Sequence, residues 1–267
     1  VYYIADVALV VCMIVRLLVD YIGTAYHGWQ KQKGLDTVQE RLENAVKSLT
    51  GQQVCVHGSG RTDAGVHAVG QTAHFELVDT GRSYNFEKGL NHYLPADIRV
   101  LDARIERENF HARFSVKKKT YRYLIYESQS DRAVFLNRAM RSAVRLDVDA
   151  MNEAAACLAG EHDFTSFMST GSPVKSTVRT VYALEVSRFC GLVAVTVTAN
   201  GFLYNMVRRI ASALIKVGKG DWTPGDVKKV LLALDGTLIK DIVPACGLYL
   251  MSVEYDEDKP ERENKPQ

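Results

Sequence analysis

The stretch His57–Gly70, "HGSGRTDAGVHAVG", joins two strand-like runs with no helix between them, which predicts two consecutive strands at this point of the chain. The run "QVCVH" ends at its first residue, and the run "GQTAHFEL" begins at its last. Both runs carry Val, Thr or Phe among polar residues, which is typical of strands. Glycines at positions 58, 60 and 65 allow sharp turns between the two strands.

Further elements lie on both sides of this loop in the first half of the chain. A strand is predicted at 14–21, and a helix follows Thr37, which matches a capping box with Glu40. After the loop strands come a short helix at 85–94, stopped before a proline, and a strand at 98–105. The order of elements in this half is therefore β-α-β-β-α-β.

The second half of the chain shows the same order of elements, although no residue-level repeat is visible. Its predicted elements are a strand at 119–126, a helix at 149–160 closed by Gly160, a hairpin over 180–199 that turns at Cys190-Gly191, an amphipathic helix at 203–218, a helix after Thr223-Pro224 and a strand at 247–255.

These patterns predict an α+β protein made of two fused β-α-β-β-α-β halves, similar to ferredoxin-like and RNA-recognition (RRM-like) units, with joined antiparallel sheets. We expect the halves to span residues 13–116 and 117–255. Residues 1–12 are interpreted as an extension that is not native, with Met13 as the natural start, and 256–267 as a charged, disordered tail.

The composition excludes several classes of protein. The chain of 267 residues has a net charge of only +2 and five scattered cysteines without a C-x-x-C motif, which indicates neither a disulfide framework nor a thiolate metal site. The uninterrupted apolar run Val7–Val15 is far shorter than the ~20 residues of a membrane span. We therefore expect a cytoplasmic protein that does not cross a membrane.

Asp63, within the glycine loop, admits three interpretations. A phosphate-binding loop is disfavoured because no Gly-Lys-Ser/Thr follows. An aspartic-protease pair with Asp79, which also begins a D-x-G tripeptide, is excluded because one predicted strand separates the two carboxylates by tens of ångströms. A lone carboxylate, ionised beside a cation, is a candidate nucleophile, and a turn cap or a surface ion pair is the structural alternative.

Seven blocks of sequence support the catalytic interpretation. "GSGRTDAGVHA" resembles the signature of the tRNA pseudouridine synthase A family. The blocks "GTAYHGWQKQ", "TVQERLENAV", "NFHARFSVKKKTYRYLIY", "GEHDFTSF", "NGFLYNMVRRI" and "GLYLMSVEY" resemble that family's other motifs in the same order, over Met13–Tyr255. The resemblance implies a central active-site cleft between two fused halves, and isomerisation of uridine to pseudouridine at positions 38, 39 and 40 of the tRNA anticodon stem-loop without a cofactor or a metal.

The resemblance also implies a role for individual residues. Asp63 matches the catalytic nucleophile, and Arg208 matches the basic residue that pairs with it. Tyr121 matches the tyrosine that packs on the target base, and Leu248 an apolar residue that lines the pocket. Arg61 matches the arginine that enters the RNA helix where the uridine leaves it, a step in which unstacking costs a few kcal/mol.

Other basic residues are predicted to contact the RNA backbone. His111 and Arg113, together with the lysines 117 to 119 (Lys118 at their centre), are candidates, since basic clusters near strand ends can follow phosphates. Arg209 is expected to contact solvent or phosphate. The resemblance further implies a tRNA substrate and a homodimer.

Two departures from the family pattern and one alternative function stay open. Ile22 stands where the family has Asp, and Ala245-Cys246 stands in place of a proline-rich run. His162 and Asp163 in "GEHDF" are interpreted as a structural turn and not as a metal site. The alternative function is a non-catalytic RNA-binding protein made of two RRM-like halves, although the aromatic motif that marks such sheets is absent.

Overall fold

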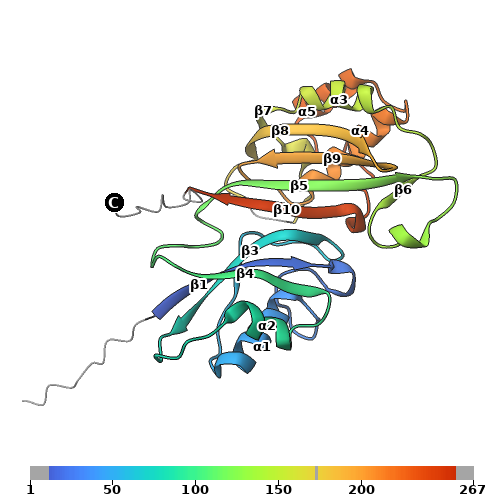
Figure 1. The fold of residues 1–267 in the computed structure, drawn as a ribbon. Coiled ribbons are helices and arrows are strands. Elements are labelled where there is room, and N and C mark those ends of the chain that lie inside the picture. Colours follow the sequence, from blue (N-terminus) through green and yellow to red (C-terminus); the bar gives the residue numbers. More distant parts are fainter. Residues whose placement is uncertain (1–11, 172–173, 257–267) are drawn as a thin grey trace, which may run out of the picture.

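The computed structural model describes residues 12–171 and 174–256, which form a ten-stranded sheet and five α-helices. The strands follow one another in the order β4-β1-β3-β10-β5-β9-β8-β7, with β2 paired to β3 and β6 paired to β5. A single mixed sheet therefore runs through both halves (Figure 1). Within the described residues, no helix is both long and apolar enough to cross a membrane.

The first half places two helices on one side of its strands (Figure 1). β1 and β3 are antiparallel partners, and β4 pairs with the other edge of β1. The elements of this half are β1 (Cys12–Tyr21), α1 (Val38–Thr50), β2 (His57–Gly58), β3 (His67–Val78), α2 (Phe86–Tyr93) and β4 (Ile98–Glu106).

The second half carries three helices, and its hairpin turns at Cys190-Gly191, where both residues have positive φ. Such a two-residue turn matches the twist of the strands it joins. The elements are β5 (Val116–Glu127), β6 (Met140–Ser142), α3 (Val148–Ala156), β7 (Gly160–Asp163), β8 (Val178–Phe189), β9 (Leu192–Ala199), α4 (Met206–Gly218), α5 (Pro224–Ala233) and β10 (Leu248–Tyr255). Four short 3-10 helices lie at Gly23–Ala25, Ala133–Phe135, Thr165–Phe167 and Ala245–Gly247.

The two halves join where β10 pairs with β3. Tyr249 is opposite His67 and Leu250 is opposite Ala68, and the pairing is parallel. The strand pairs within the two halves are antiparallel, as predicted, except for β5 with β6. The sequence predicted that the two sheets are joined but not the direction of the strands at the join. Gly70 permits the close approach, since a Cβ there would lie 2.4 Å from the Met251 carbonyl oxygen.

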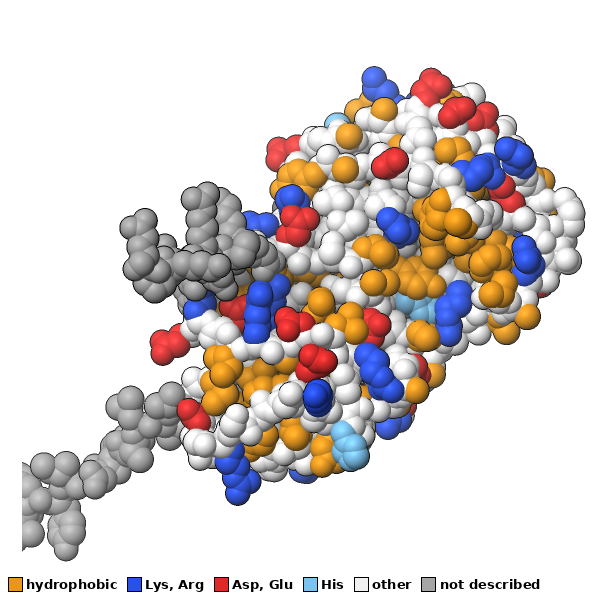
Figure 2. All heavy atoms as spheres, in the orientation of Figure 1, with side chains coloured by type: hydrophobic (Ala, Val, Ile, Leu, Met, Phe, Trp, Pro, Cys, Tyr) orange, Lys and Arg blue, Asp and Glu red, His pale blue; other side chains and the backbone are white. Residues whose placement is uncertain are grey.

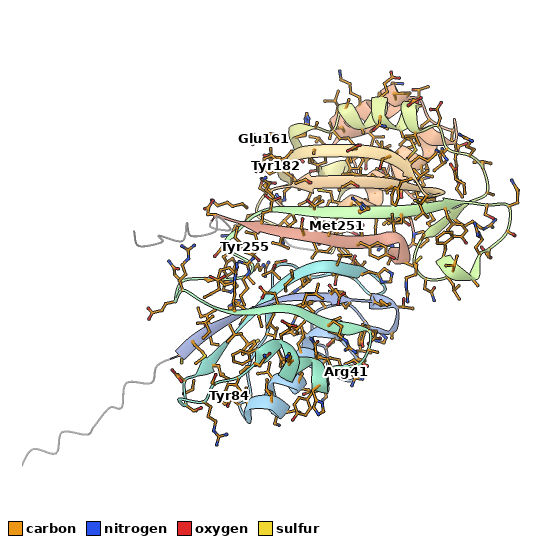
Figure 3. The ribbon with its side chains drawn as sticks, in the orientation of Figure 1. Arg41, Tyr84, Glu161, Tyr182, Met251 and Tyr255 are labelled. Atoms are coloured by element: carbon orange, nitrogen blue, oxygen red, sulfur yellow. The ribbon has the colours of Figure 1, made fainter. Side chains whose placement is uncertain are left out.

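Hydrogen bonds of two side chains, His67 and Tyr255, also connect the two halves near this junction. The His67 Nδ1 accepts the Gly23 N–H at 3.1 Å, so Nε2 carries the proton and donates to the Cys246 carbonyl at 3.2 Å. Burial lowers the pKa of His67, which keeps the ring neutral. At the end of β10, the Tyr255 hydroxyl donates to the Ala112 carbonyl of the other half (Figure 3).

Three local predictions need correction. The strand expected at 53–57 is reduced to β2, because the Val56 N–H donates to the Glu43 carboxylate instead of to a neighbouring strand. The helix expected at 149–160 ends at Ala156. Gly160 then opens β7, so the predicted turn around His162 and Asp163 is a strand paired with β8.

Candidate active site

A cleft of about 1140 Å³ opens between the two halves, and both contribute its walls. On the face shown in Figure 2, basic and acidic side chains are mixed over both halves. Among the described residues that line the cleft, by contrast, Asp63 is the one acid. The cations that line it are Arg61, Arg113, Lys119, Arg179 and Arg208. The cleft is therefore suited to a polyanion.

The loop that carries Asp63 is held by its own backbone. The Trp29 N–H donates to the Thr62 carbonyl at 3.0 Å, and the Val66 N–H donates to the Asp63 carbonyl at 3.1 Å. Gly65 has a φ of +78°, the left-handed region that glycine adopts at low cost. A Cβ on Gly28 would lie 2.5 Å from the Thr62 oxygen, so only glycine fits against this loop.

Side chains hold the other end of the loop. The Ser59 hydroxyl donates to Gln71 Oε1 at 2.6 Å, and Gln71 Nε2 donates to the Gly60 carbonyl at 3.0 Å. Lys119 Nζ donates to the Ser59 carbonyl at 2.6 Å. Because Lys119 belongs to β5, the second half of the chain helps to position a loop of the first.

Asp63 and Arg208 face each other across the cleft. Asp63 Oδ2 lies 3.7 Å from Arg208 Nη1, and the Asp63 side chain is 38% exposed. Arg208 is directed there by two further acceptors, the Val243 carbonyl at 2.8 Å and Asn205 Oδ1 at 2.9 Å. Burial raises the pKa of Asp63, and the positive charge of Arg208 opposes that rise.

Asn205 begins α4 in an unusual conformation. Its φ of 61° lies in the left-handed region, which Asn tolerates better than most residues. Its amide nitrogen donates to Ser169 Oγ at 3.1 Å while its amide oxygen accepts from Arg208. The start of α4 therefore fixes the direction of the Arg208 side chain.

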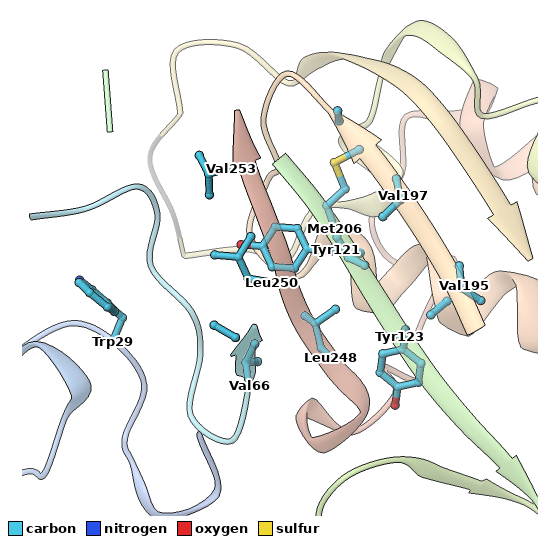
Figure 4. Packing of buried hydrophobic residues seen from close by; sticks show 14 of the residues in the cluster. Trp29, Val66, Tyr121, Tyr123, Val195, Val197, Met206, Leu248, Leu250 and Val253 are labelled. Carbon is cyan, nitrogen blue, oxygen red and sulfur yellow. The ribbon is translucent and has the colours of Figure 1, made fainter. Parts of the chain in front are cut away.

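Tyr121 and Leu248 form part of the wall near Asp63, on the neighbouring strands β5 and β10 (Figure 4). The Tyr121 ring packs edge-on against Phe202, with 5.0 Å between the ring centroids. Burial raises the pKa of Tyr121 well above its ordinary value, and Tyr21 and Asp63 add to the rise. The phenol is therefore protonated at neutral pH.

Some of the residues predicted to contact RNA line the cleft, and others do not. Arg61, His111 and Arg113 line the cleft, and Arg61 is exposed. Lys118 is not among the lining residues, because alternate residues of β5 point to opposite faces and Lys119 faces the cleft. Lys118 pairs with Glu254 of the adjacent strand at 2.9 Å. Lys117 likewise pairs with Asp256 at 2.6 Å.

Arg209 is not a solvent contact, and that prediction is wrong. Only 8% of the residue is exposed. Its guanidinium donates to Ser169 Oγ, the Ser166 carbonyl and the Gly236 carbonyl, at 3.2, 3.3 and 2.7 Å. Arg209 thus ties α4 to two loops of the second half.

Sequence reasoning named Lys119 only as a contact to the RNA backbone and missed its bond to the Asp63 loop. Lys119 lies two positions before Tyr121, and alternate residues of a strand share a face, which was a usable signal. Two further residues of the site were not named at all. Trp29 packs on Gly58, where a Cβ would lie 2.5 Å from the indole. No comparable signal marked Asn205. Within residues 12–171 and 174–256, no group of three or more His, Cys, Asp or Glu side chains is placed to hold a metal ion.

Comparison with known proteins places this site in a family. A family model described as tRNA pseudouridine synthase matches residues 17–115 and 154–256, which include Asp63, Arg208 and Leu248. The chain belongs to this tRNA pseudouridine synthase family. As a member, it is an isomerase that converts uridine to pseudouridine in tRNA.

Individual members of the tRNA pseudouridine synthase family resemble the chain over most of its length. The tRNA pseudouridine synthase A of Ruminiclostridium cellulolyticum is 44% identical over 90% of this chain and 99% of its own. The enzyme of the same name from Agrobacterium fabrum is 42% identical over 92% of this chain and 94% of its own. Among solved structures, a chain of a Cbf5-Nop10-Gar1 complex covers 75% of this chain and 45% of its own, at 16% identity and a TM-score of 0.32.

Proposed function

We propose that this synthase isomerises uridines at positions 38, 39 and 40 of the tRNA anticodon stem-loop, with Asp63 as its nucleophile. The observation that carries the proposal is the Asp63–Arg208 pair, because it sets the one described acid of a cationic cleft against a fixed guanidinium. Burial raises the pKa of the Asp63 carboxyl group, and the charge of Arg208 opposes that rise and so favours the ionised carboxylate, which is the nucleophilic form.

The isomerisation is balanced within the substrate. The bond between N1 of the base and C1′ of the ribose breaks, the base turns, and a bond forms between C5 and C1′. The proton on C5 is lost, and N1 gains one. Asp63 starts the reaction by attack on the uridine, at the sugar or at the base, and leaves at the end as a free carboxylate. No oxidant or cofactor is needed for this balance.

The surrounding residues position the uridine in this proposal. Tyr121 packs on the target base, where its protonated hydroxyl can also donate a hydrogen bond. Leu248 closes the apolar side of the pocket. Arg61, exposed at the cleft, fills the gap that the uridine leaves in the RNA, since a planar guanidinium stacks well.

The RNA backbone is held by the basic residues of the cleft and its surroundings. His111 and Arg113 line the cleft and contact phosphates in this proposal. Lys118 contributes less, because Glu254 already pairs with it. Exposed ion pairs of this kind are weak, so a phosphate can replace the carboxylate.

The proposal also covers the two halves of the chain, the oligomeric state and the location of the enzyme. The halves over 13–116 and 117–255 are two copies of one ferredoxin-like unit in this proposal, which is supported by the antiparallel strand pairs and the α-helices that each half contains. The enzyme works in the cytoplasm as a homodimer whose two subunits together form one basic cleft for tRNA. Light scattering at micromolar concentration tests the dimer, and a monomer there would contradict it.

Tritium release from C5-labelled uridine in an unmodified tRNA tests the nucleophile. Wild-type protein should release tritium, and Asp63→Asn should reduce release by about 10⁴-fold or more while it binds tRNA with similar affinity. Asp79→Asn is the matched control, because Asp79 starts a D-x-G tripeptide but lies exposed outside the cleft. Equal release by Asp63→Asn and wild type would refute the role of Asp63. Binding without release by any of the three proteins would favour the RNA-binding alternative.

A further inference from the structure

Four aromatic rings form a continuous cluster beside the cleft, in which tilted and edge-on contacts follow one another. We call Phe114, His111, His57 and His74 the rim stack. The Phe114 and His111 centroids are 4.3 Å apart, and His111 lies 4.6 Å from His74 and 5.5 Å from His57. Phe114, His111 and His57 line the cleft. The proposed function uses none of these rings to bind a base, and His111 enters it only as a contact to phosphate.

Hydrogen bonds fix the rings of the rim stack. His111 Nδ1 accepts the Arg113 N–H at 3.1 Å and the Phe114 N–H at 3.4 Å. His74 Nδ1 accepts the Ala112 N–H at 3.1 Å. Burial lowers the pKa of both His111 and His74, the latter to about 4, so these two rings are uncharged at neutral pH. The stack is therefore a rigid and largely apolar surface.

Phe114 ends the rim stack and is open to solvent. The residue is 77% exposed, and the Arg113 guanidinium lies 5.8 Å from its ring centroid. A phenyl group gains nothing from water, whereas its face offers a large area to another ring. A flat partner can therefore stack on the exposed part of the Phe114 ring.

The charge of the cleft identifies the kind of partner. Arg61, Arg113 and Lys119 line the same cleft as Phe114, His111 and His57, and Lys119 also contacts the loop of His57–Gly70. An aromatic face among cations is the arrangement by which proteins bind single-stranded nucleic acid, where bases stack and phosphates pair. An apolar protein segment would leave these positive charges without negative partners.

The proposed function assigns the target uridine to Asp63, Tyr121 and Leu248. Phe114, His111 and His57 line the same cleft but have no base assigned to them. The cleft of about 1140 Å³ exceeds the volume of the small-molecule pockets, ~300–1,000 Å³, that hold one drug-sized ligand. It therefore has room for a second nucleotide.

We propose that the rim stack is a second base-binding subsite, in which an unpaired base of the substrate RNA stacks on Phe114 while its phosphate contacts Arg113. The proposal rests on the proposed function for the identity of the RNA. It adds a base that the enzyme binds but does not modify. Such a subsite holds the strand on one side of the target and fixes which uridine reaches Asp63.

A mutant cycle between protein and RNA tests the subsite. Phe114→Leu and Phe114→Trp are compared with wild type for binding to an unmodified anticodon stem-loop, in which each loop nucleotide is replaced in turn by an abasic one. Tyr93→Leu is the matched control, since Tyr93 is 50% exposed and lies outside the cleft. Tritium release is measured on the same samples.

We expect Phe114→Leu to weaken binding by about 5- to 100-fold, the range of one lost base stack, and Phe114→Trp to bind like wild type. Tyr93→Leu should not change affinity. At one loop position the abasic RNA should abolish the difference between wild type and Phe114→Leu. Equal affinities of Phe114→Leu and wild type for intact RNA, or a difference that persists at every abasic position, would overturn the subsite. Coupling without tritium release would keep the subsite and refute the proposed reaction.

Discussion

The guanidinium groups of Arg208 and Arg209, adjacent on α4, point to different partners. Arg208 faces Asp63 across the cleft, whereas Arg209 binds loops of the second half of the chain. Arg208 lies 3.7 Å from the Asp63 carboxylate. Arg209 donates to the Ser166 and Gly236 carbonyls behind the helix. Substitution of the first should therefore affect the reaction, and substitution of the second should affect stability.

Arg208→Gln should shift the acidic limb of the activity profile to higher pH. Burial raises the pKa of Asp63, and the charge of Arg208 holds that rise in check. Without that charge the carboxyl group protonates at a higher pH, so the ionised fraction at a given acidic pH falls. We expect a loss of about 10²-fold in kcat/KM at neutral pH. The pH dependence of tritium release measures this shift. An unchanged acidic limb would show that Arg208 does not influence the ionisation of Asp63.

Arg209→Lys should lower the free energy of unfolding by about 2–4 kcal/mol, because an ammonium group cannot reach three acceptors in the places of a guanidinium. Urea denaturation measures the change. Arg208→Lys serves as the comparison, and its stability should fall by less, because the Arg208 side chain is 18% exposed and donates to two acceptors instead of three. A wild-type midpoint for Arg209→Lys would contradict the structural role of Arg209.

Lys119 should make stability rise with pH on the alkaline side. Burial, with Arg113 nearby, lowers its pKa to about 8, from the 10.5 of a free lysine. Between these values the unfolded chain binds more protons than the folded one, so stability increases with pH. The difference in unfolding free energy between wild type and Lys119→Met should therefore change by up to about 3 kcal/mol from pH 7.5 to 10.5. A constant difference over that range would show that Lys119 titrates normally.

Gly70→Ala should separate the two halves. Its Cβ would lie 2.4 Å from the Met251 carbonyl oxygen, a backbone atom that no rotamer change can move. We expect a loss of about 1–3 kcal/mol or more in stability, together with a loss of activity, since Asp63 and Tyr121 lie on different sides of the join.

Gly225→Ala is the control for this substitution. Gly225 lies in α5 with its nearest neighbour 3.7 Å from the added carbon, so alanine should stabilise the helix by about 0.5–1 kcal/mol. Full activity of Gly70→Ala would mean that the join tolerates a wider spacing.

The sequence correctly predicted those helices and turns that are determined by residues close together in the chain. The helix expected at 85–94 is present as α2, because Asn85 caps it with a bond to the Lys88 N–H. The hairpin over 180–199 is present because Cys190-Gly191 adopts the turn that two strands require. In both cases the deciding residues are neighbours in the sequence.

Features that depend on distant residues were not predictable in the same way. Arg209 is buried because Ser166 and Gly236 offer carbonyls from loops far along the chain. The strand expected at 53–57 is interrupted by Glu43, a helix residue. At the candidate site, the resemblance singled out Asp63 and Arg208, but periodicity alone did not reveal Lys119 as a support of the loop.

The single sheet that passes through the β3–β10 join has a mechanical consequence. Because one hydrogen-bonded sheet joins both walls of the cleft, we expect the walls to move less relative to each other than two lobes on a flexible linker would. The bending needed to bring a uridine to Asp63 then falls on the RNA. Selection among tRNAs becomes a matter of how readily each stem deforms, so the softness of the stem is expected to count as much as its sequence.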